Sequence, residues 1–260
     1  MKNVEIVRAA GQDIPEIISL FRSYDFALIR KQWLWWKYFQ NPAGDALMFK
    51  VLNRSKLVGA VAIIPQVFTF SGKEIIGLQT VDGLLGMEIR GQGFFNELMH
   101  FLSTQRPEGV PEKSFYLSFP SLAVSVKAHE NAGWRRLADF GLITALLNPE
   151  LVFRKKGMVA VGKYMALPWK MIKRAFMFAP ADGISVNDVS GRLSDLNDYL
   201  PEGFVAGDRS AAFMKWRVGE NPRDRMTMLE FQKEGNPVGY AICKFVHRCV
   251  EITEIRGTRQ

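Results

Sequence analysis

A glycine-containing turn in the first half of the chain has the residue types of an anion-binding site. Arg90, Gly91, Gln92 and Gly93 precede apolar residues at helical spacing, namely Phe94, Phe95, Leu98, Met99 and Leu102. The first main-chain N–H groups of a helix have no internal partner, and the helix dipole favours negative charge there. Glycines let a phosphate approach the main chain, because no Cβ stands in the way. We therefore expect a strand, a turn and a helix start that bind a phosphate group.

The spacing of the glycines argues against a dinucleotide fingerprint, since the third position of G-x-G-x-x-G is Asn96. The same segment, Arg-Gly-Gln-Gly-Phe-Phe, resembles motif A of the GNAT (GCN5-related N-acetyltransferase) superfamily. In that family the turn holds the pyrophosphate of acetyl-CoA. The resemblance implies that acetyl-CoA is the acyl donor. The residues that it assigns to acetyl-CoA binding are Arg90, Gly91, Gln92, Gly93, Phe94 and Phe95.

A second segment resembles the family's Pro-Asn…Tyr-x-x-x-Gly-Phe pattern. It runs from Phe119-Pro120-Ser121 to Gly133-Trp134. By this resemblance Ser121 takes the place of the asparagine that contacts the cofactor. His129 takes the place of the tyrosine that protonates the leaving thiolate, and the alternative for His129 is a surface histidine on a helix.

The family's fourth and fifth strands separate, and the pantetheine of acetyl-CoA lies between them like an added strand. Gly83, Leu84 and Leu85 match the fourth strand, and the segment 117–119 matches the fifth. Asp82 precedes these residues and is the candidate base that takes a proton from the acceptor amine. Burial would have to raise the pKa of an aspartate for this role. The alternative is a charged residue at a solvated strand end.

The amino-acid composition limits which binding partners can be expected. The chain has 260 residues, and Lys plus Arg outnumber Asp plus Glu by 34 to 26. This surplus would suit an anionic ligand, a nucleic acid or an acidic membrane surface. Cys243 and Cys249 have no metal-site spacing, so we expect no metal site and a reducing, cytoplasmic location.

The pattern along the chain predicts an α/β (α+β) fold. We expect strands at Val4–Arg8, Leu47–Leu52, Leu57–Phe70, Ile75–Leu85 and Ser114–Phe119, and helices after Asp13, at 33–39, after Gly93 and at 122–131. This order resembles the GNAT acyltransferase fold over residues 4–148, a mixed, mostly antiparallel sheet flanked by helices. The tryptophans and other aromatic residues at 33–39 are expected in the core, with ligand stacking as the alternative.

A repeat links the two halves of the chain. Trp36, Asn41-Pro42 and Val58-Gly59 recur at Trp216, Asn221-Pro222 and Val238-Gly239, always 180 residues later. The repeat predicts a second, partial GNAT-like copy that has no glycine turn. We expect a GNAT domain at 1–150, a basic and apolar linker helix at 151–182 and the partial copy at 183–260.

The segment 154–179 mixes basic and apolar residues. It could lie on an anionic membrane as a peripheral helix, or it could pack between the domains as a linker helix. Pro168 interrupts any long amphipathic helix and favours the linker.

Together these features predict an acyl-CoA-dependent N-acyltransferase that resembles the longer bacterial tandem GNAT-like proteins. The expected reaction moves acetyl from acetyl-CoA to a small-molecule amine acceptor such as an amino sugar, and no nucleic acid partner is expected. One alternative is a FemABX-like aminoacyltransferase, which takes aminoacyl-tRNA. The other is a non-catalytic GNAT-like binding module.

Overall fold

The computed structural model describes residues 4–26, 29–111, 113–120, 122–137, 183–191, 196, 205–246 and 249–257. The chain divides into two compact units. One consists of Met1–Arg136, Val186–Phe231 and Val238–Gln260, and the other of Leu137–Ser185 and Gln232–Pro237. The contacts and clefts discussed below lie within the first unit.

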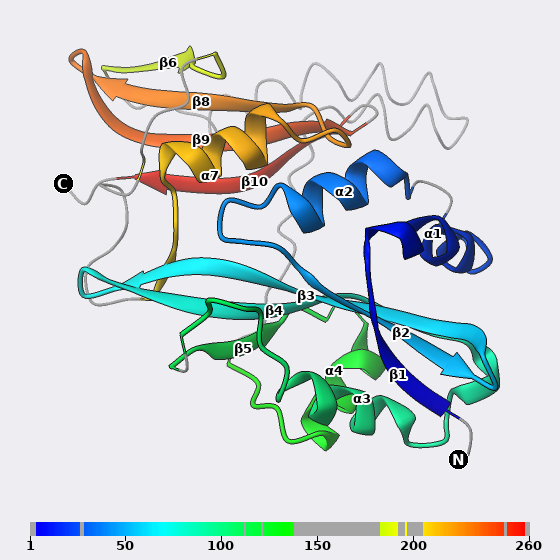
Figure 1. Ribbon diagram of the computed structural model, residues 1–260. Coiled ribbons are helices and arrows are strands. Elements are labelled where there is room, and N and C mark those ends of the chain that lie inside the picture. Colours follow the sequence, from blue (N-terminus) through cyan, green and yellow to red (C-terminus); the bar gives the residue numbers. More distant parts are fainter. Residues whose placement is uncertain are drawn as a thin grey trace, which may run out of the picture. The chain divides into compact units, whose positions relative to one another are not determined.

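The first sheet is mixed and mostly antiparallel (Figure 1). Its antiparallel strands, in the order in which they pair, are β1 (Val4–Ala9), β2 (Leu47–Asn53), β3 (Lys56–Phe70) and β4 (Lys73–Leu85). A short parallel strand, β5 (Phe115–Ser118), pairs with β4, and β7 (Ala206–Gly207) pairs with the far end of β3.

Helices cover both faces of this sheet (Figure 1). The helices α1 (Ile14–Arg22) and α2 (Lys31–Phe39) pack on one face, and α3 (Phe94–Leu102) packs on the other, next to α4 (Ala123–Asn131). Successive residues of β3 alternate between the two cores, since Ala62 and Ile64 face α1 and α2 while Ile63 faces α3. The predicted fold class is confirmed.

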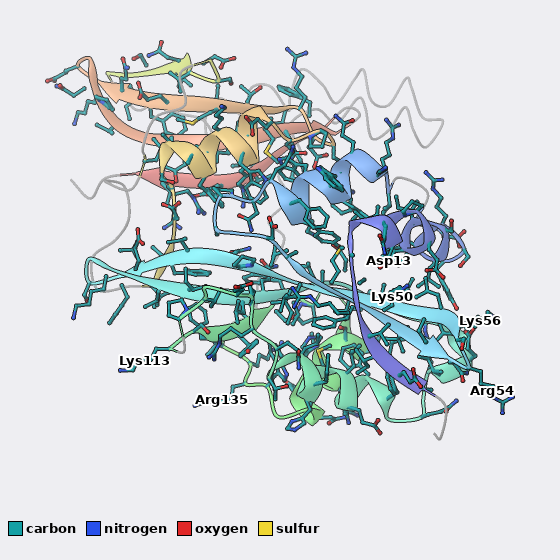
Figure 2. All side chains as sticks on the ribbon, viewed as in Figure 1. Asp13, Lys50, Arg54, Lys56, Lys113 and Arg135 are labelled. Carbon is teal, nitrogen blue, oxygen red and sulfur yellow. The ribbon has the colours of Figure 1, made fainter. Side chains whose placement is uncertain are left out.

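The start of α1 is fixed to the sheet by an ion pair. Lys50 on β2 donates to Asp13 at 2.8 Å, and both residues are labelled in Figure 2. Asp13 also accepts the N–H of Ala10 at 2.8 Å, so it closes the short 3-10 turn Gly11–Asp13 and makes no capping bond to α1. These two contacts lower the pKa of the Asp13 carboxyl, the Ala10 N–H more than Lys50. Asp13 is the N-cap residue of α1 by position, and Pro15 lies in the first helical turn.

The second sheet repeats the strand order of the first. Its strands are β6 (Ile184–Asp188), β8 (Met226–Lys233), β9 (Asn236–Val246) and β10 (Cys249–Gly257), and they are arranged as β6-β8-β9-β10. The helical segment before β8 consists of α7 (Ala211–Met214) and a π-turn, η5 (Lys215–Gly219). A strand, a helical segment and a three-stranded meander therefore occur twice in the same order.

The two copies also agree in register. The helical residues 211–219 match α2 at 31–39, and β6 begins 180 residues after β1. The β2–β3 turn has positive φ at Arg54 and Ser55, and the β8–β9 turn has it at Glu234 and Gly235. The second sheet therefore has the element order and the turn positions of the partial copy that the sequence predicts.

Two tryptophans of the repeat meet face to face. The rings of Trp36 on α2 and Trp216 on η5 stack with centroids 4.6 Å apart and an interplanar angle of 18°. The Trp36 indole N–H donates to the carbonyl of Trp216 at 3.1 Å, and the Trp216 indole donates to the carbonyl of Trp36 at 3.2 Å. Such a reciprocal exchange is the contact that a two-fold axis generates between equivalent copies. Both side chains are buried, so Trp36 belongs to the core as expected.

Several predictions fall on residues that the structure does not describe. They concern residues 138–148 of the predicted GNAT domain, the linker helix at 151–182 and the segment 154–179, for which a membrane contact was one alternative. Among the described residues, no helix combines the length and the apolar character needed to cross a membrane.

Candidate functional site

The strands β4 and β5, the last pair in the order of the first sheet, separate part of the way along β4. They pair in parallel from Gly77 and Phe115 to Thr80 and Ser118, where β5 ends. β4 continues to Leu85, so its edge beyond Thr80 has no strand beside it among the described residues. This open edge lies where the sequence predicts the separation of the fourth and fifth strands.

A bulge in β4 lies directly beyond this point. The register between β3 and β4 shifts here, because Ala60 pairs with Leu84 and Ala62 pairs with Val81. Two residues of β4, Asp82 and Gly83, therefore lie opposite the single residue between Ala60 and Ala62. Asp82 has a φ of 52°, in the left-handed region that aspartate tolerates better than most residues. Bulges bend a strand and redirect its side chains, and they are frequent next to active sites.

A cleft of about 610 Å³ opens at the bulge and is lined from both faces of the sheet. Trp33 and Lys37 of α2 line it on one face, and Phe95 and His129 line it on the other. Asp82 lies between them, on the edge strand. The cleft therefore passes the open edge of β4 and connects the two faces.

Asp82 is held by two donors from α2. Its Oδ2 accepts from Lys37 Nζ at 2.7 Å and from the Tyr38 hydroxyl at 2.7 Å. Burial, together with the nearby Asp82 carboxylate, holds the pKa of Tyr38 well above its usual range, so Tyr38 remains a donor. No donor among the described residues contacts Asp82 Oδ1. The ion pair with Lys37 and the hydrogen bond from Tyr38, which the sequence did not predict, fix the position of the carboxylate.

His129 is a buried residue of α4, with 8% of its surface exposed. Its Nδ1 lies 2.7 Å from the carbonyl oxygen of Ser125, and because a carbonyl only accepts, Nδ1 carries the proton. The neutral ring therefore has its lone pair at Nε2. The rings of Phe95 and Trp134 contact His129 edge to face, at 5.3 Å and 5.4 Å. His129 is thus not the surface histidine of the alternative interpretation.

The glycine turn forms a separate set of free donors. Gly91 and Gly93 have φ values of 73° and 81°, and Gly93 is the N-cap of α3. The main-chain N–H groups of residues 91–95 have no acceptor among the described residues. Apart from the adjacent residues of the chain, no atom of the described residues lies within 4 Å of a Cβ placed at either glycine, so this side of the turn has room for an approaching group. Consecutive free N–H groups at a helix start are suited to an anion.

Side-chain hydrogen bonds and a cation–π contact stabilise this turn. Arg90 Nε donates to the carbonyl of Leu85 at 2.6 Å, and its guanidinium lies 5.3 Å from the Tyr24 ring centroid. The Tyr24 hydroxyl accepts the N–H of Met87 at 3.0 Å. The Gln92 side chain donates back to the carbonyl of Glu88 at 2.8 Å, so it is used within the turn.

The structure thus groups the predicted site residues in two places. Asp82, Gly83, Phe95 and His129 line the cleft, whereas Arg90, Gly91, Gln92, Gly93 and Phe94 form or adjoin the turn. The side chains of Leu84 and Leu85 are buried in the two opposite cores, so only their main-chain atoms could contact a ligand. Ser121 lies outside the described residues.

Three residues at the cleft or its carboxylate were not predicted from the sequence: Lys37, Tyr38 and Arg223. Trp33 is one of the aromatic residues expected in the core with ligand stacking as the alternative, and it both packs partly buried against the core and lines the cleft. The repeat drew attention to Trp36 and Asn41-Pro42, and no local signal shows that Lys37 and Tyr38 reach a strand far along the chain. Arg223 has no counterpart in the first copy, where Ala43 takes the same place.

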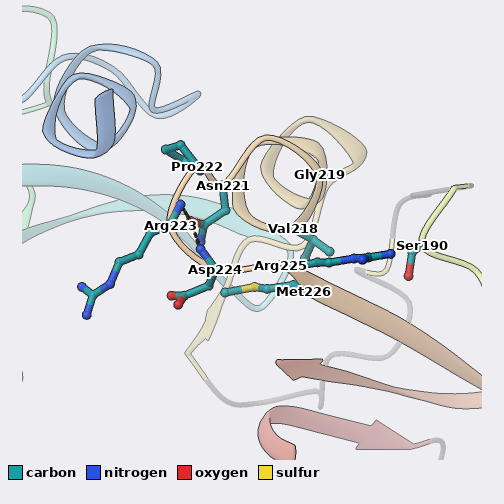
Figure 3. Close-up of a pocket in the computed structure, with 9 residues that line it drawn as sticks. All are labelled: Ser190, Val218, Gly219, Asn221, Pro222, Arg223, Asp224, Arg225 and Met226. Atoms are coloured by element: carbon teal, nitrogen blue, oxygen red, sulfur yellow. Dashed lines mark hydrogen bonds between the residues drawn. The ribbon is translucent and has the colours of Figure 1, made fainter. Parts of the chain in front are cut away.

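A smaller hollow lies at the loop that carries Arg223 (Figure 3). Its volume is about 480 Å³, and Ser190, Asn221 and Arg225 are among its lining residues. Asn221 Oδ1 accepts the N–H groups of Arg223 at 3.0 Å and of Asp224 at 3.1 Å. In Figure 3 the side chain of Arg223 extends away from Ser190 and Arg225. The loop is therefore closed by its own asparagine.

No family model matches the chain, and no curated protein matches it. Several solved structures do match the chain. A GCN5-related N-acetyltransferase from Kribbella flavida is 11% identical with a TM-score of 0.50, and the match covers 99% of this chain and 59% of that protein. A protein of unknown function from Enterococcus faecalis V583, described as a probable N-acyltransferase, is 10% identical with a TM-score of 0.49. The match covers 98% of this chain and 58% of that protein.

A predicted acetyltransferase from Clostridium acetobutylicum, solved with acetyl-CoA, is 12% identical with a TM-score of 0.42 and covers 54% of this chain and 96% of that one. The chain spans 59% and 58% of the lengths of the Kribbella and Enterococcus proteins. The similarity to the Kribbella structure, with the sheet described above, identifies the fold as that of the GCN5-related N-acetyltransferases.

Proposed function

We propose that the protein is an acyl-CoA-dependent N-acyltransferase that moves acetyl from acetyl-CoA to a small amine, such as an amino sugar. The observation that carries this proposal is the cleft at the parting of β4 and β5, where Asp82 has one carboxylate oxygen without a donor and His129 lines the other face. A proton acceptor and a titratable imidazole at one opening are the groups that acyl transfer to an amine requires.

The residues present fit acetyl-CoA. The free N–H groups of residues 91–95 and the guanidinium of Arg90 would hold the pyrophosphate. The main chain of Gly83, Leu84 and Leu85 would pair with the pantetheine along the open edge of β4, and we assign Ser121 and Phe95 to the same ligand. When bound, acetyl-CoA supplies an already activated thioester, so the protein need only position the amine and move protons.

Asp82 acts as the base in this scheme, directly or through one water molecule. Lys37 and Tyr38 occupy Oδ2 and fix the carboxylate, which leaves Oδ1 to take a proton from the acceptor nitrogen. His129 acts as the acid. Because Nδ1–H is bonded to Ser125, Nε2 is the nitrogen that would have to carry the second proton and donate it to the departing thiolate.

The pyrophosphate assignment is tested by replacing Gly93 with valine. The change places a side chain beside the free N–H groups, so the affinity for acetyl-CoA should fall at least tenfold, about 1.4 kcal/mol. Gly109→Val is the matched control. Gly109 also has a positive φ (78°) and open space at its Cβ, so it carries the same backbone strain at a site outside the turn.

Calorimetric titration of acetyl-CoA into the wild type and both variants gives the three affinities. Near-wild-type affinity in a folded Gly93→Val protein would remove the turn from the cofactor site. Equal losses in both variants would show that backbone strain, rather than the site, is responsible.

A further inference from the structure

A side chain from the second copy lines the cleft of the first. Of the described residues beyond 137, Arg223 alone contributes to the cleft lining. Its guanidinium carbon lies 4.9 Å from the ring centroid of Trp33, a residue of α2 that also lines the cleft. Lys37 Nζ lies 5.0 Å from the same ring. The α2 side of the cleft is therefore formed by residues from both copies.

The fold of the loop does not require an arginine at this position. Asn221 closes the loop by accepting the main-chain N–H of Arg223 at 3.0 Å. In the first copy Asn41 accepts the N–H of Ala43 at 3.1 Å in the same way. Because alanine suffices for the turn, the arginine side chain has no role in forming it. The loop is fixed by its own asparagine and presents the guanidinium to the cleft.

Arg223 has no ion-pair partner among the described residues, although the carboxylate of Asp25 also lines the cleft. The other cation on the α2 side of the cleft, Lys37, is paired with Asp82 at 2.7 Å. An arginine stacked on an aromatic ring keeps its N–H edge available, and its planar fork matches a carboxylate or a phosphate. The α2 side of the cleft thus has a positioned cation without an ion-pair partner among these residues.

We propose that the acceptor is an amine that also carries an anionic group, a carboxylate or a phosphate, and that Arg223 binds this group. This inference rests on the proposed N-acyltransferase function. The amine end of such an acceptor would face Asp82 Oδ1, and the anionic end would face Arg223 beside Trp33. The second copy would then select the acceptor for the site in the first.

The test compares amines that differ only in the anion. One pair is glucosamine 6-phosphate and glucosamine, and the other is β-alanine and its amide, so the two pairs separate phosphate from carboxylate. The wild type should show a kcat/KM at least tenfold higher for the anionic member of one pair. Arg223→Ala should bring this ratio close to one, chiefly by raising KM for the anionic member, and Arg223→Lys should keep part of it.

Arg225→Ala is the matched control, since Arg225 is an exposed arginine on the same loop and is not among the residues that line the cleft. Its ratio should equal that of the wild type. The inference is overturned if the wild type has equal kcat/KM within both pairs, or if Arg223→Ala lowers both members equally.

A parallel calorimetric titration with acetyl-CoA distinguishes a failure of this inference from a failure of the proposed N-acyltransferase function. Binding of acetyl-CoA and transfer to the neutral amines without any preference would overturn this inference alone. No binding and no transfer to any of the four amines would overturn the proposed function as well.

Discussion

Asp82 combines an unusual backbone conformation with a tightly specified side chain. A non-glycine residue in the left-handed region costs on the order of 1–3 kcal/mol in strained sites, less for aspartate than for bulky residues. The contacts with Lys37 and Tyr38 compensate and fix the direction of the carboxylate. This conformation, beside an open strand edge and a cleft, supports the role that we propose for Asp82.

The role of Asp82 can be separated from cofactor binding. Asp82→Asn keeps the size of the side chain and removes the proton acceptor, so turnover should fall on the order of a hundredfold or more. The affinity for acetyl-CoA should stay close to that of the wild type, since the base acts on the acceptor. Asp45→Asn, at an exposed aspartate that does not line the cleft, serves as the control. Steady-state kinetics and calorimetry give both values, and a wild-type kcat for Asp82→Asn would exclude the assignment.

The elements α2 and η5 carry equivalent tryptophans that stabilise each other. Each indole donates to the carbonyl of the other tryptophan, and both rings are buried in the same stack. Loss of one indole N–H removes one buried hydrogen bond, worth about 0.5–1.5 kcal/mol, and the carbonyl of Trp36 would still accept the N–H of Gln40 at 3.2 Å. The pair thus couples the helical segments of the two copies. One of these, α2, also carries the donors to Asp82.

This coupling is measurable with a double-mutant cycle. Trp36→Phe and Trp216→Phe should each lower the free energy of unfolding, and the two losses should not add, with an interaction energy of about 0.5–3 kcal/mol. Trp35→Phe, in the same helix but 43% exposed, should cost much less. Urea denaturation of the four proteins in the cycle gives the coupling directly. Additive losses would show that the tryptophans act independently.

For the whole molecule, the sequence predicted the parts that depend on local pattern. Hydrophobic periodicity and turn residues predicted the meander of β2, β3 and β4, because strand alternation and tight turns are encoded by neighbouring residues. The constant spacing of 180 residues predicted the second copy. Arg90 to Gly93 were identified because a helix start with glycines has a recognisable order of residues.

The remaining site residues come together only through tertiary packing. The pairing of Lys37 with Asp82 depends on how α2 lies on β4, and the approach of Arg223 to Trp33 depends on the packing of one copy on the other. Neither contact leaves a periodic trace in the sequence. The hydrogen bond that fixes the His129 tautomer is local, yet the burial of that ring by Phe95 and Trp134 is not.

Acyl transfer from acetyl-CoA to an amine can be measured in a single assay. The wild-type protein is incubated with acetyl-CoA and a panel of small amines, and mass spectrometry follows the acetylated amine while a thiol reagent follows the released CoA. N-acetylated product and free CoA should form in equal amounts, at a rate well above that without protein. Binding of acetyl-CoA by the folded protein with no product from any amine would contradict the proposed function and identify a binding module instead.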